Sequence, residues 1–280
     1  MPTKRLEVVY IVPSRYDDDG YVIRWLRGVV PSNSLACLRG LTLDIAQEGQ
    51  IRDVEITVDA LDESIHSIPV RKIAKRAKRP DTTLLVGIVG VQSNQFARAS
   101  DLALEFREHG VSVMIGGFHV SGMLSLFDEP SPDLQRVLDA GVTLVQGEAE
   151  AAGALEGILR DAANGEMAPI YRLPKGPDIS EAPLPAVEPG YVKRFAAQLG
   201  TVDTSRGCPF TCSFCTIINV QGRKMRCRSA ETVLASIRRD YEAGIKGYFF
   251  TDDNFSRSRI WREVFEGLKE MRAEGKPISF

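Results

Sequence analysis

Short apolar runs alternate with longer amphipathic segments from residue 6 of the chain onward. Several of these runs are rich in valine and isoleucine and are apolar throughout, which is typical of strands covered on both faces of a sheet. They predict strands at 6–12, 54–61, 84–91, 111–115 and 143–145.

Between these runs, apolar residues recur at helical spacing and predict helices at 34–47, 70–78, 95–109, 134–140 and 150–164. The clearest is 95–109, where Phe96, Ala99, Leu102 and Phe106 share one face and charged residues the other. Alternating strands and helices indicate an α/β fold with a parallel, Rossmann-like sheet. We expect this first domain to span 1–165.

A proline-rich segment follows at 166–199, with Pro183 near its centre. It predicts an extended linker, because proline disfavours helices and central strands. The strand–helix alternation restarts near residue 200, with strands predicted at 201–204 and 247–251, helices at 230–243 and 260–274, and a further strand opening at 278–280. We therefore expect 200–280 to be the start of a second domain, and the chain to be the N-terminal part of a longer protein.

The composition argues against several classes of protein. The chain has 280 residues, with 35 Lys and Arg against 37 Asp and Glu, so no basic excess points to a nucleic-acid partner. No apolar run approaches the ~20 residues that span a bilayer. The first residues lack an apolar signal segment. We expect a cytoplasmic protein with no membrane span.

The five cysteines are unevenly placed. Cys37 stands alone, whereas Cys208, Cys212, Cys215 and Cys227 fall close together. The first three of these form a C-x3-C-x2-C pattern directly after a predicted strand, and a loop this short can bind one corner of a cubic iron–sulfur cluster and leave one iron open. The alternative is structural zinc with Cys227 as fourth ligand, but zinc loops usually pair their cysteines as C-x2-C.

The cysteine motif resembles that of the radical S-adenosylmethionine (SAM) enzymes, with Phe214 as the aromatic residue before the last cysteine. The resemblance implies a [4Fe-4S] cluster held by Cys208, Cys212 and Cys215, with SAM bound at the open iron. It further implies reductive cleavage of SAM to a 5′-deoxyadenosyl radical, an external electron donor of the flavodoxin or ferredoxin type, and a partial (β/α) barrel of which this chain holds the beginning.

Polar residues follow the predicted strand 247–251 and suggest a second part of the site. Asp252, Asp253 and Asn254 are placed where barrel folds build their active sites. Related enzymes often use an acidic pair here near the SAM amino group, although these residues are also good helix N-caps.

A basic stretch lies between the cysteine motif and the next predicted helix. Arg223, Lys224, Arg226 and Arg228 could neutralise an anionic cofactor or substrate, or form a solvated face, which is the commoner role of such a run. Cys227 is interpreted as a solvated loop cysteine.

Three predicted strand ends of the first domain carry glycine or polar residues, and together they resemble the cobalamin-binding domain of B12-dependent radical SAM proteins. The resemblance suggests a cobalamin site, for which the candidate residues are Ser93, Asn94, Gly116, Gly117, His119, Gly147 and Glu148. The D-x-H-x-x-G signature of several B12 proteins is absent. His119 could therefore either touch cobalamin or be a structural residue. One cysteine, Cys37, cannot build the second cluster of the methylthiotransferases.

The resemblance thus implies a cobalamin-dependent radical SAM enzyme that methylates an unactivated centre of a small-molecule substrate. The alternatives are a non-methylating rearrangement with the same cofactors, or a fragment that binds cofactors without turnover. The sequence assigns no catalytic residue.

Overall fold

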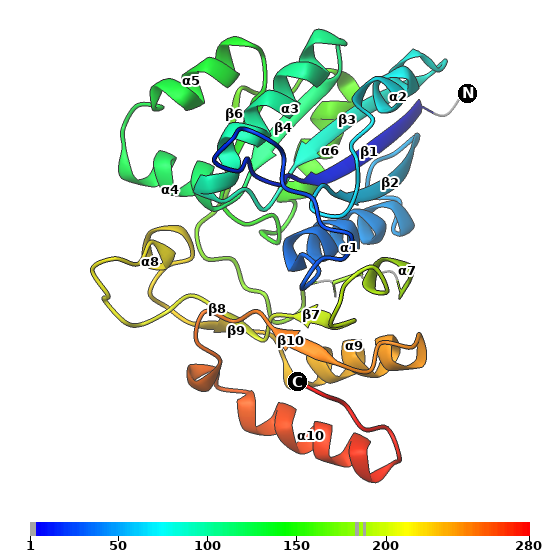
Figure 1. Cartoon of the computed structure of the whole chain (residues 1–280), viewed down its shortest axis with the longest axis vertical. Helices are drawn as coiled ribbons and strands as arrows, with labels where there is room; N and C mark the ends of the chain where they lie inside the picture. Colours follow the sequence, from blue (N-terminus) through cyan, green and yellow to red (C-terminus); the bar gives the residue numbers. More distant parts are fainter. Residues whose placement is uncertain (1–3, 183–184, 187–188) are drawn as a thin grey trace.

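The first half of the chain forms a six-stranded sheet in which every strand pairing is parallel (Figure 1). The computed structural model describes residues 4–182, 185–186 and 189–280. Five strands confirm the predicted runs, and a sixth is added at the edge. The strands, in sheet order, are β2 (Val54–Asp62), β1 (Lys4–Val12), β3 (Thr82–Ile88), β4 (Ser112–Gly116), β5 (Thr143–Gln146) and β6 (Ile170–Arg172).

The strand order reverses between β1 and β3, so the chain runs outward from the middle of the sheet in both directions. In open α/β sheets, ligands bind outside the carboxyl ends of the strands near such a switch point. The fold therefore directs attention to the loops that follow β3, β4 and β5.

Helices cover both faces of the sheet, as the apolar strands predict. On one face Val9 and Ile11 of β1 pack into a core with α2, α3, α4 and α5, and on the other Val8 and Tyr10 pack into a core with α1 and α6. The helices are α1 (Asn33–Gln47), α2 (Val70–Ala74) with the short η1 (Lys75–Lys78), η2 (Ser93–Gln95), α3 (Phe96–Glu108), α4 (Phe118–Leu126), α5 (Pro132–Asp139) and α6 (Ala154–Asn164).

Two elements of this half were not predicted from the sequence. Helix α4 is apolar along most of its length, so it has no helical periodicity to recognise. Strand β6 is three residues long and lies in the proline-rich segment, where it occupies the sheet edge that proline-flanked strands tolerate.

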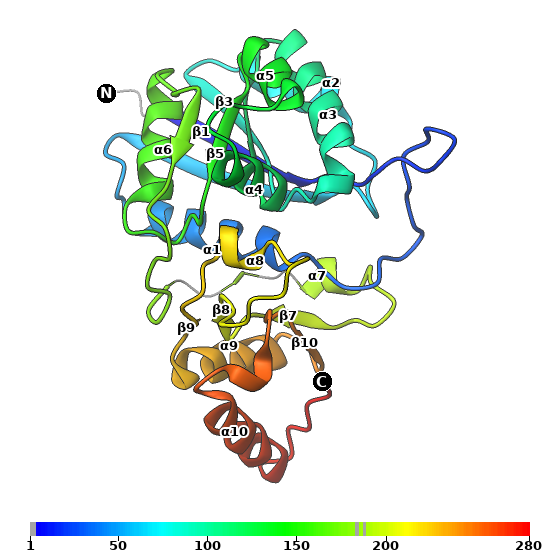
Figure 2. The ribbon, with the colours of Figure 1, turned by 90° about the vertical axis from the view of Figure 1, so that its left-hand side faces the viewer.

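The second half contains another parallel sheet, of two strands (Figure 2). Strands β7 (Gly200–Val202) and β10 (Tyr248–Phe250) pair in parallel, with helices α9 (Ala230–Glu242) and α10 (Trp261–Ala273) packed around their own apolar core. Residues 278–280 form an isolated parallel bridge between Ser279 and Gly247 rather than a strand. The remaining elements are β8 (Ser205–Arg206), α8 (Ile217–Val220), β9 (Arg226–Cys227) and η3 (Phe255–Arg257).

The segment between the halves packs against the first half. Arg194 donates to the Ile65 carbonyl at 2.7 Å, and the Tyr191 hydroxyl to Asp62 Oδ2 at 2.9 Å. It also contains the short helix α7 (Pro189–Val192). Pro183 lies outside the described residues, and the division of the chain at 165 and 199 stays a prediction.

None of the described helices combines the length and apolar composition that crossing a bilayer requires.

Candidate cofactor-binding site

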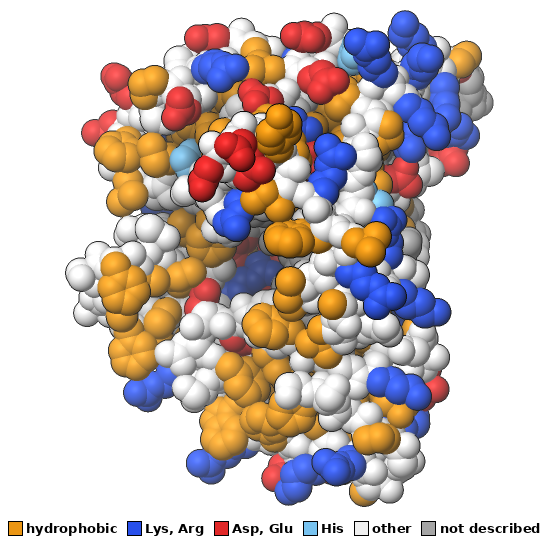
Figure 3. Space-filling model, viewed as in Figure 1, with side chains coloured by type: hydrophobic (Ala, Val, Ile, Leu, Met, Phe, Trp, Pro, Cys, Tyr) orange, Lys and Arg blue, Asp and Glu red, His pale blue; other side chains and the backbone are white. Residues whose placement is uncertain are grey.

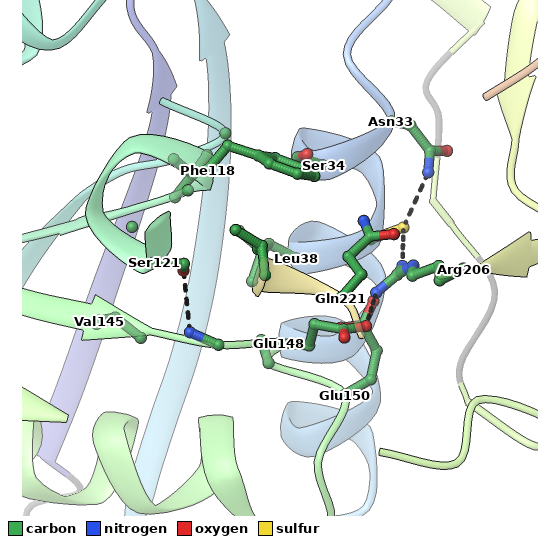
Figure 4. A pocket seen from close by; sticks show the side chains of 18 of the residues that line it. Asn33, Ser34, Leu38, Phe118, Ser121, Val145, Glu148, Glu150, Arg206 and Gln221 are labelled. Carbon is green, nitrogen blue, oxygen red and sulfur yellow. Dashed lines mark hydrogen bonds and ion pairs between the residues drawn. The ribbon is translucent and has the colours of Figure 1, made fainter. Parts of the chain in front are cut away.

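A cavity of about 260 Å³ lies between the strand ends of the sheet and the start of the second half. The space-filling view shows a hollow at this level, with basic side chains at its base (Figure 3). Gly90, Gly116 and Gly147 line it from the loops after β3, β4 and β5, and α1 contributes Leu38. Arg206 and Asp253 line the opposite wall, so the cavity is built by both halves (Figure 4).

The chain needs glycine at two of the predicted strand ends. Gly117 has φ of +142°, and a Cβ there would lie 2.2 Å from the backbone nitrogen of Val91. Gly147 has φ of +106° and donates its N–H to Ser121 Oγ at 3.1 Å. Both glycines, together with Gly116 and Glu148, line the cavity.

Three other predicted residues lie outside the cavity lining. His119 Nδ1 is 3.2 Å from Ser93 Oγ, and its ring stacks on Phe96 at 4.2 Å between centroids. Burial lowers the pKa of His119 and favours the neutral ring. Asn94 lies in η2 together with Ser93. Ser93, Asn94 and His119 therefore lie together, outside the lining of the cavity.

Charged side chains from both halves meet at one wall of the cavity. Glu148 accepts hydrogen bonds from Arg206 at 3.0 Å and from Arg226 at 2.6 and 3.0 Å. Asp203 lies between Arg206 at 3.0 Å and Arg228 at 3.4 Å. Arg226 and Arg228 are therefore buried and paired with acidic side chains, so the interpretation of the basic run as a solvated face is wrong for these two residues. Arg223 and Lys224 are exposed.

Two acidic groups of this network, Asp203 and Glu150, stay ionised. Burial alone would raise the pKa of Asp203, but Arg206 and Arg228 lower it to about 2. Burial likewise opposes the ionisation of Glu150, and Arg206 at 2.5 Å shifts its pKa below the ordinary value. Arg206 is held fully charged because Asp203 and Glu150 outweigh the effect of its burial on its pKa.

The cysteine loop begins two residues after Arg206. Gly207 has φ of +87°, donates its N–H to Asp253 Oδ2 at 3.2 Å and to Gln221 Oε1 at 3.1 Å, and would clash with the Lys224 carbonyl if it carried a Cβ. Cys208 and Cys215 are half-buried and Cys212 is exposed, all as free thiols. The donor set thus fits an iron–sulfur cluster.

The described residues contain no cluster of three or more His, Cys, Asp or Glu side chains close enough to hold a metal ion. The three thiols are therefore not gathered around one point in this conformation of the loop. Cys227 lies in β9 opposite Ser205 and is half-buried, not a solvated loop residue.

Comparison with known proteins places this geometry in context. An uncharacterised methyltransferase of Synechocystis is 33% identical over 172 residues, which cover 60% of this chain and 29% of that protein. The bacteriochlorophyllide d C-12(1)-methyltransferase of Chlorobaculum tepidum is 30% identical over 173 residues, 59% of this chain and 35% of that protein. No protein-family model matches the chain.

A solved structure matches almost the whole chain. The radical SAM methyltransferase TsrM of Kitasatospora setae, with cobalamin and a [4Fe-4S] cluster bound, superposes with a TM-score of 0.62 at 17% identity. The match covers 97% of this chain and 51% of TsrM. The chain thus has the fold of this part of TsrM, and its sequence is similar to those of two methyltransferases. It spans about a third of the length of the two curated relatives and about half of TsrM.

The residues after β10 are engaged within the second half. Asp252 accepts hydrogen bonds from the Thr204 N–H at 3.0 Å, from Thr204 Oγ1 at 2.6 Å and from Ser205 Oγ at 2.5 Å. Asn254 precedes η3 without a side-chain cap. Burial raises the pKa of both Asp252 and Asp253, and Asp253 faces the cavity.

Sequence reasoning missed several residues at the junction. Asp203, Arg206, Asn33 and Glu150 all line the cavity, and Asn33 donates to Asp203 Oδ1 at 3.0 Å. In the sequence, Arg206 stands next to the cysteine motif, and Glu150 belongs to the same strand-end run as Gly147 and Glu148. Asn33 and Asp203 carry no such signal, and they meet although they are 170 residues apart.

Proposed function

We propose that the chain carries the cofactor-binding part of a cobalamin-dependent radical SAM methyltransferase. The observation that supports this most directly is the cavity whose two walls are the glycine-bearing strand ends and residues Arg206 and Gln221, which lie on either side of the cysteine motif. That arrangement lets one ligand held by the sheet face another held by the loop. Cytoplasmic location, a small-molecule substrate and a flavodoxin- or ferredoxin-type electron donor are parts of this proposal.

Each half would hold its own cofactor. Cys208, Cys212 and Cys215 supply the thiolates for a [4Fe-4S] cluster, with Phe214 beside the last of them, exposed. Gly116, Gly117 and Gly147 line the cavity at the strand ends, where cobalamin would lie against their backbone. When bound, the cofactors supply radical formation from SAM and methyl transfer.

Asp253 is the residue we place near the SAM ammonium group. It lines the cavity and accepts a hydrogen bond from the Gly207 N–H at the base of the cysteine loop. Burial and the neighbouring Asp252 raise its pKa, so a cation bound beside it would favour its ionised form. Asp252 instead holds Thr204 and Ser205 in place.

The first experiment is anaerobic reconstitution of the 280-residue chain with iron, sulfide and hydroxocobalamin, followed by metal analysis and an absorbance spectrum. We expect about four irons and one cobalt per chain. Cys212→Ala should lose most of the iron and keep the cobalt, whereas the matched control Cys227→Ala should keep both. Iron without cobalt, or iron retained when all three motif cysteines are replaced, would contradict the proposal.

A further inference from the structure

Two arginines at the two ends of the cysteine segment converge on one carboxylate of the first half. Arg206 of β8 lies just before the segment 207–225, and Arg226 of β9 lies just after it. Both bind Glu148, which follows β5: Arg206 through one nitrogen at 3.0 Å, and Arg226 through a two-pronged contact at 2.6 and 3.0 Å. Figure 4 shows Arg206 beside Glu148 and Glu150 at the cavity wall.

These charges are withdrawn from solvent and balanced. The side chains of Glu148, Arg206 and Arg226 are 9%, 13% and 8% exposed. Glu150 and Asp203 add negative charge, and Arg228 adds positive charge, so three acids meet three bases. Loss of one partner from such a group leaves an uncompensated buried charge, which disrupts the contact far more than loss of an exposed pair.

Arg226 is also bonded to the backbone of the cysteine segment, and the two ends of that segment are bonded to each other. Arg226 donates to the Gln221 carbonyl at 3.1 Å, and the Cys208 N–H donates to the Gly222 carbonyl at 3.2 Å. Any movement of the segment away from the sheet would therefore move both arginines away from Glu148.

We propose that Glu148 is a positioning residue which, with Arg206 and Arg226, clamps both ends of segment 207–225 to the strand-end loop of β5. The Glu148 clamp is a property of the cofactor-free chain and goes beyond the proposed function. Its consequence, a fixed separation between the cluster-binding loop and the glycine-lined strand ends, rests on that function. Glu148 then serves the cobalamin site by orientation, not as a ligand.

Cys37 provides a built-in reporter of the clamp. Its thiol is 5% exposed and lies 3.8 Å from Arg206 and 3.9 Å from Asp203, at the junction of the halves. Burial and Asp203 raise the pKa of the thiol, so alkylation is slow while the junction is closed. Trypsin releases Cys37 in the peptide 28–39, which holds no other cysteine.

The test compares alkylation of Cys37 by iodoacetamide in the reduced, cofactor-free 280-residue chain and its variants, followed by mass spectrometry of that peptide. Glu148→Gln should raise the rate about tenfold. The matched control is Glu63→Gln, which breaks an equally buried pair with Arg98 inside the first half, at 2.6 Å. The control should leave the Cys37 rate within about twofold of the original chain.

Arg226→Lys keeps the charge but loses the two-pronged contact, and should give an intermediate rate, with Arg98→Lys as its control. If circular dichroism shows that Glu148→Gln does not fold, the comparison of Arg226→Lys with Arg98→Lys tests the clamp instead. An unchanged rate in the folded clamp variants, or an equal rise in the Glu63 and Arg98 controls, would overturn the clamp. Because no cofactor is present, failure here leaves the metal analysis of the proposed function untouched, and the reverse also holds.

Discussion

Asp203 lies in the turn between β7 and β8, and its carboxylate is paired with Arg206 and Arg228. The Asn33 side chain and the Cys37 thiol complete its surroundings. Arg206 is three residues away along the chain, whereas Asn33 and Cys37 are more than 160 residues away. This carboxylate therefore joins α1 of the first half to the strands that flank the cysteine loop.

The pH dependence of stability should reveal this role. The pKa of Asp203 falls from 3.8 to about 2 on folding, so its contribution is present above pH ~4 and is lost as the pH falls toward 2. The proton-linked part amounts to about 2 kcal/mol, and Asp203→Asn should cost at least that at pH 7, since it leaves two arginines under-paired. The measurement is urea unfolding of both proteins between neutral and acid pH.

The difference in unfolding free energy between the original chain and Asp203→Asn should be largest near neutrality and shrink below pH ~4. Asp128, an exposed residue, supplies the control Asp128→Asn. A difference that stayed constant across this range would mean that Asp203 acts by packing alone.

The site residues divide into those that local sequence can identify and those that it cannot. Gly116, Gly117 and Gly147 follow apolar strands, and the backbone geometry after a parallel strand explains why glycine occurs there. Arg226 and Arg228 sit in a run of positive charge whose sequence gives no sign of burial. Their burial depends on Glu148 and Asp203, partners that only the tertiary structure supplies.

Secondary elements were predictable where burial leaves a periodic pattern. Strands β1 to β5 and helices α1, α3, α9 and α10 match their predicted positions closely, because each is long enough to show an apolar face or run. Helix α4 and strand β6 were not predicted, for different reasons. Helix α4 is apolar along most of its length, and strand β6 is very short. Residues 278–280 make only a bridge, in which Ser279 pairs with Gly247 just before β10.

Strand β6 is held at the sheet edge by a tyrosine. The Tyr171 hydroxyl donates to Asp161 Oδ2 of α6 at 2.6 Å and accepts the Ala168 N–H at 3.1 Å. Burial raises its pKa to about 12, so it remains a donor. Tyr171→Phe should cost about 1 kcal/mol and speed amide hydrogen exchange at Leu173, whose N–H bonds to the Gln146 carbonyl. Unchanged exchange there would show that backbone pairing alone fixes β6.

The two halves of the molecule are organised differently. The first has two apolar cores, one on each face of its sheet, whereas the second has one core around a two-stranded sheet. Alternating strands and helices were enough to predict both halves as α/β. The junction between them was not predictable, because Glu148 and Arg226 are 78 residues apart and meet only through the packing of both halves.

The position of β6 makes the predicted boundary at 165 testable. A fragment 1–174 keeps all six strands and both apolar cores. Without the second half, Glu148 and Glu150 lose their arginine partners and are hydrated instead. This fragment should unfold in one cooperative transition.

A fragment 1–165 loses β6 and with it the bonds from the Leu144 N–H and Thr143 Oγ1 to the carbonyls of 169 and 168. Loss of these bonds and of β6 packing should cost about 3 kcal/mol, which lowers the midpoint by roughly 10 °C. Thermal unfolding followed by far-UV circular dichroism compares the two, and equal midpoints would place the end of the first domain at 165.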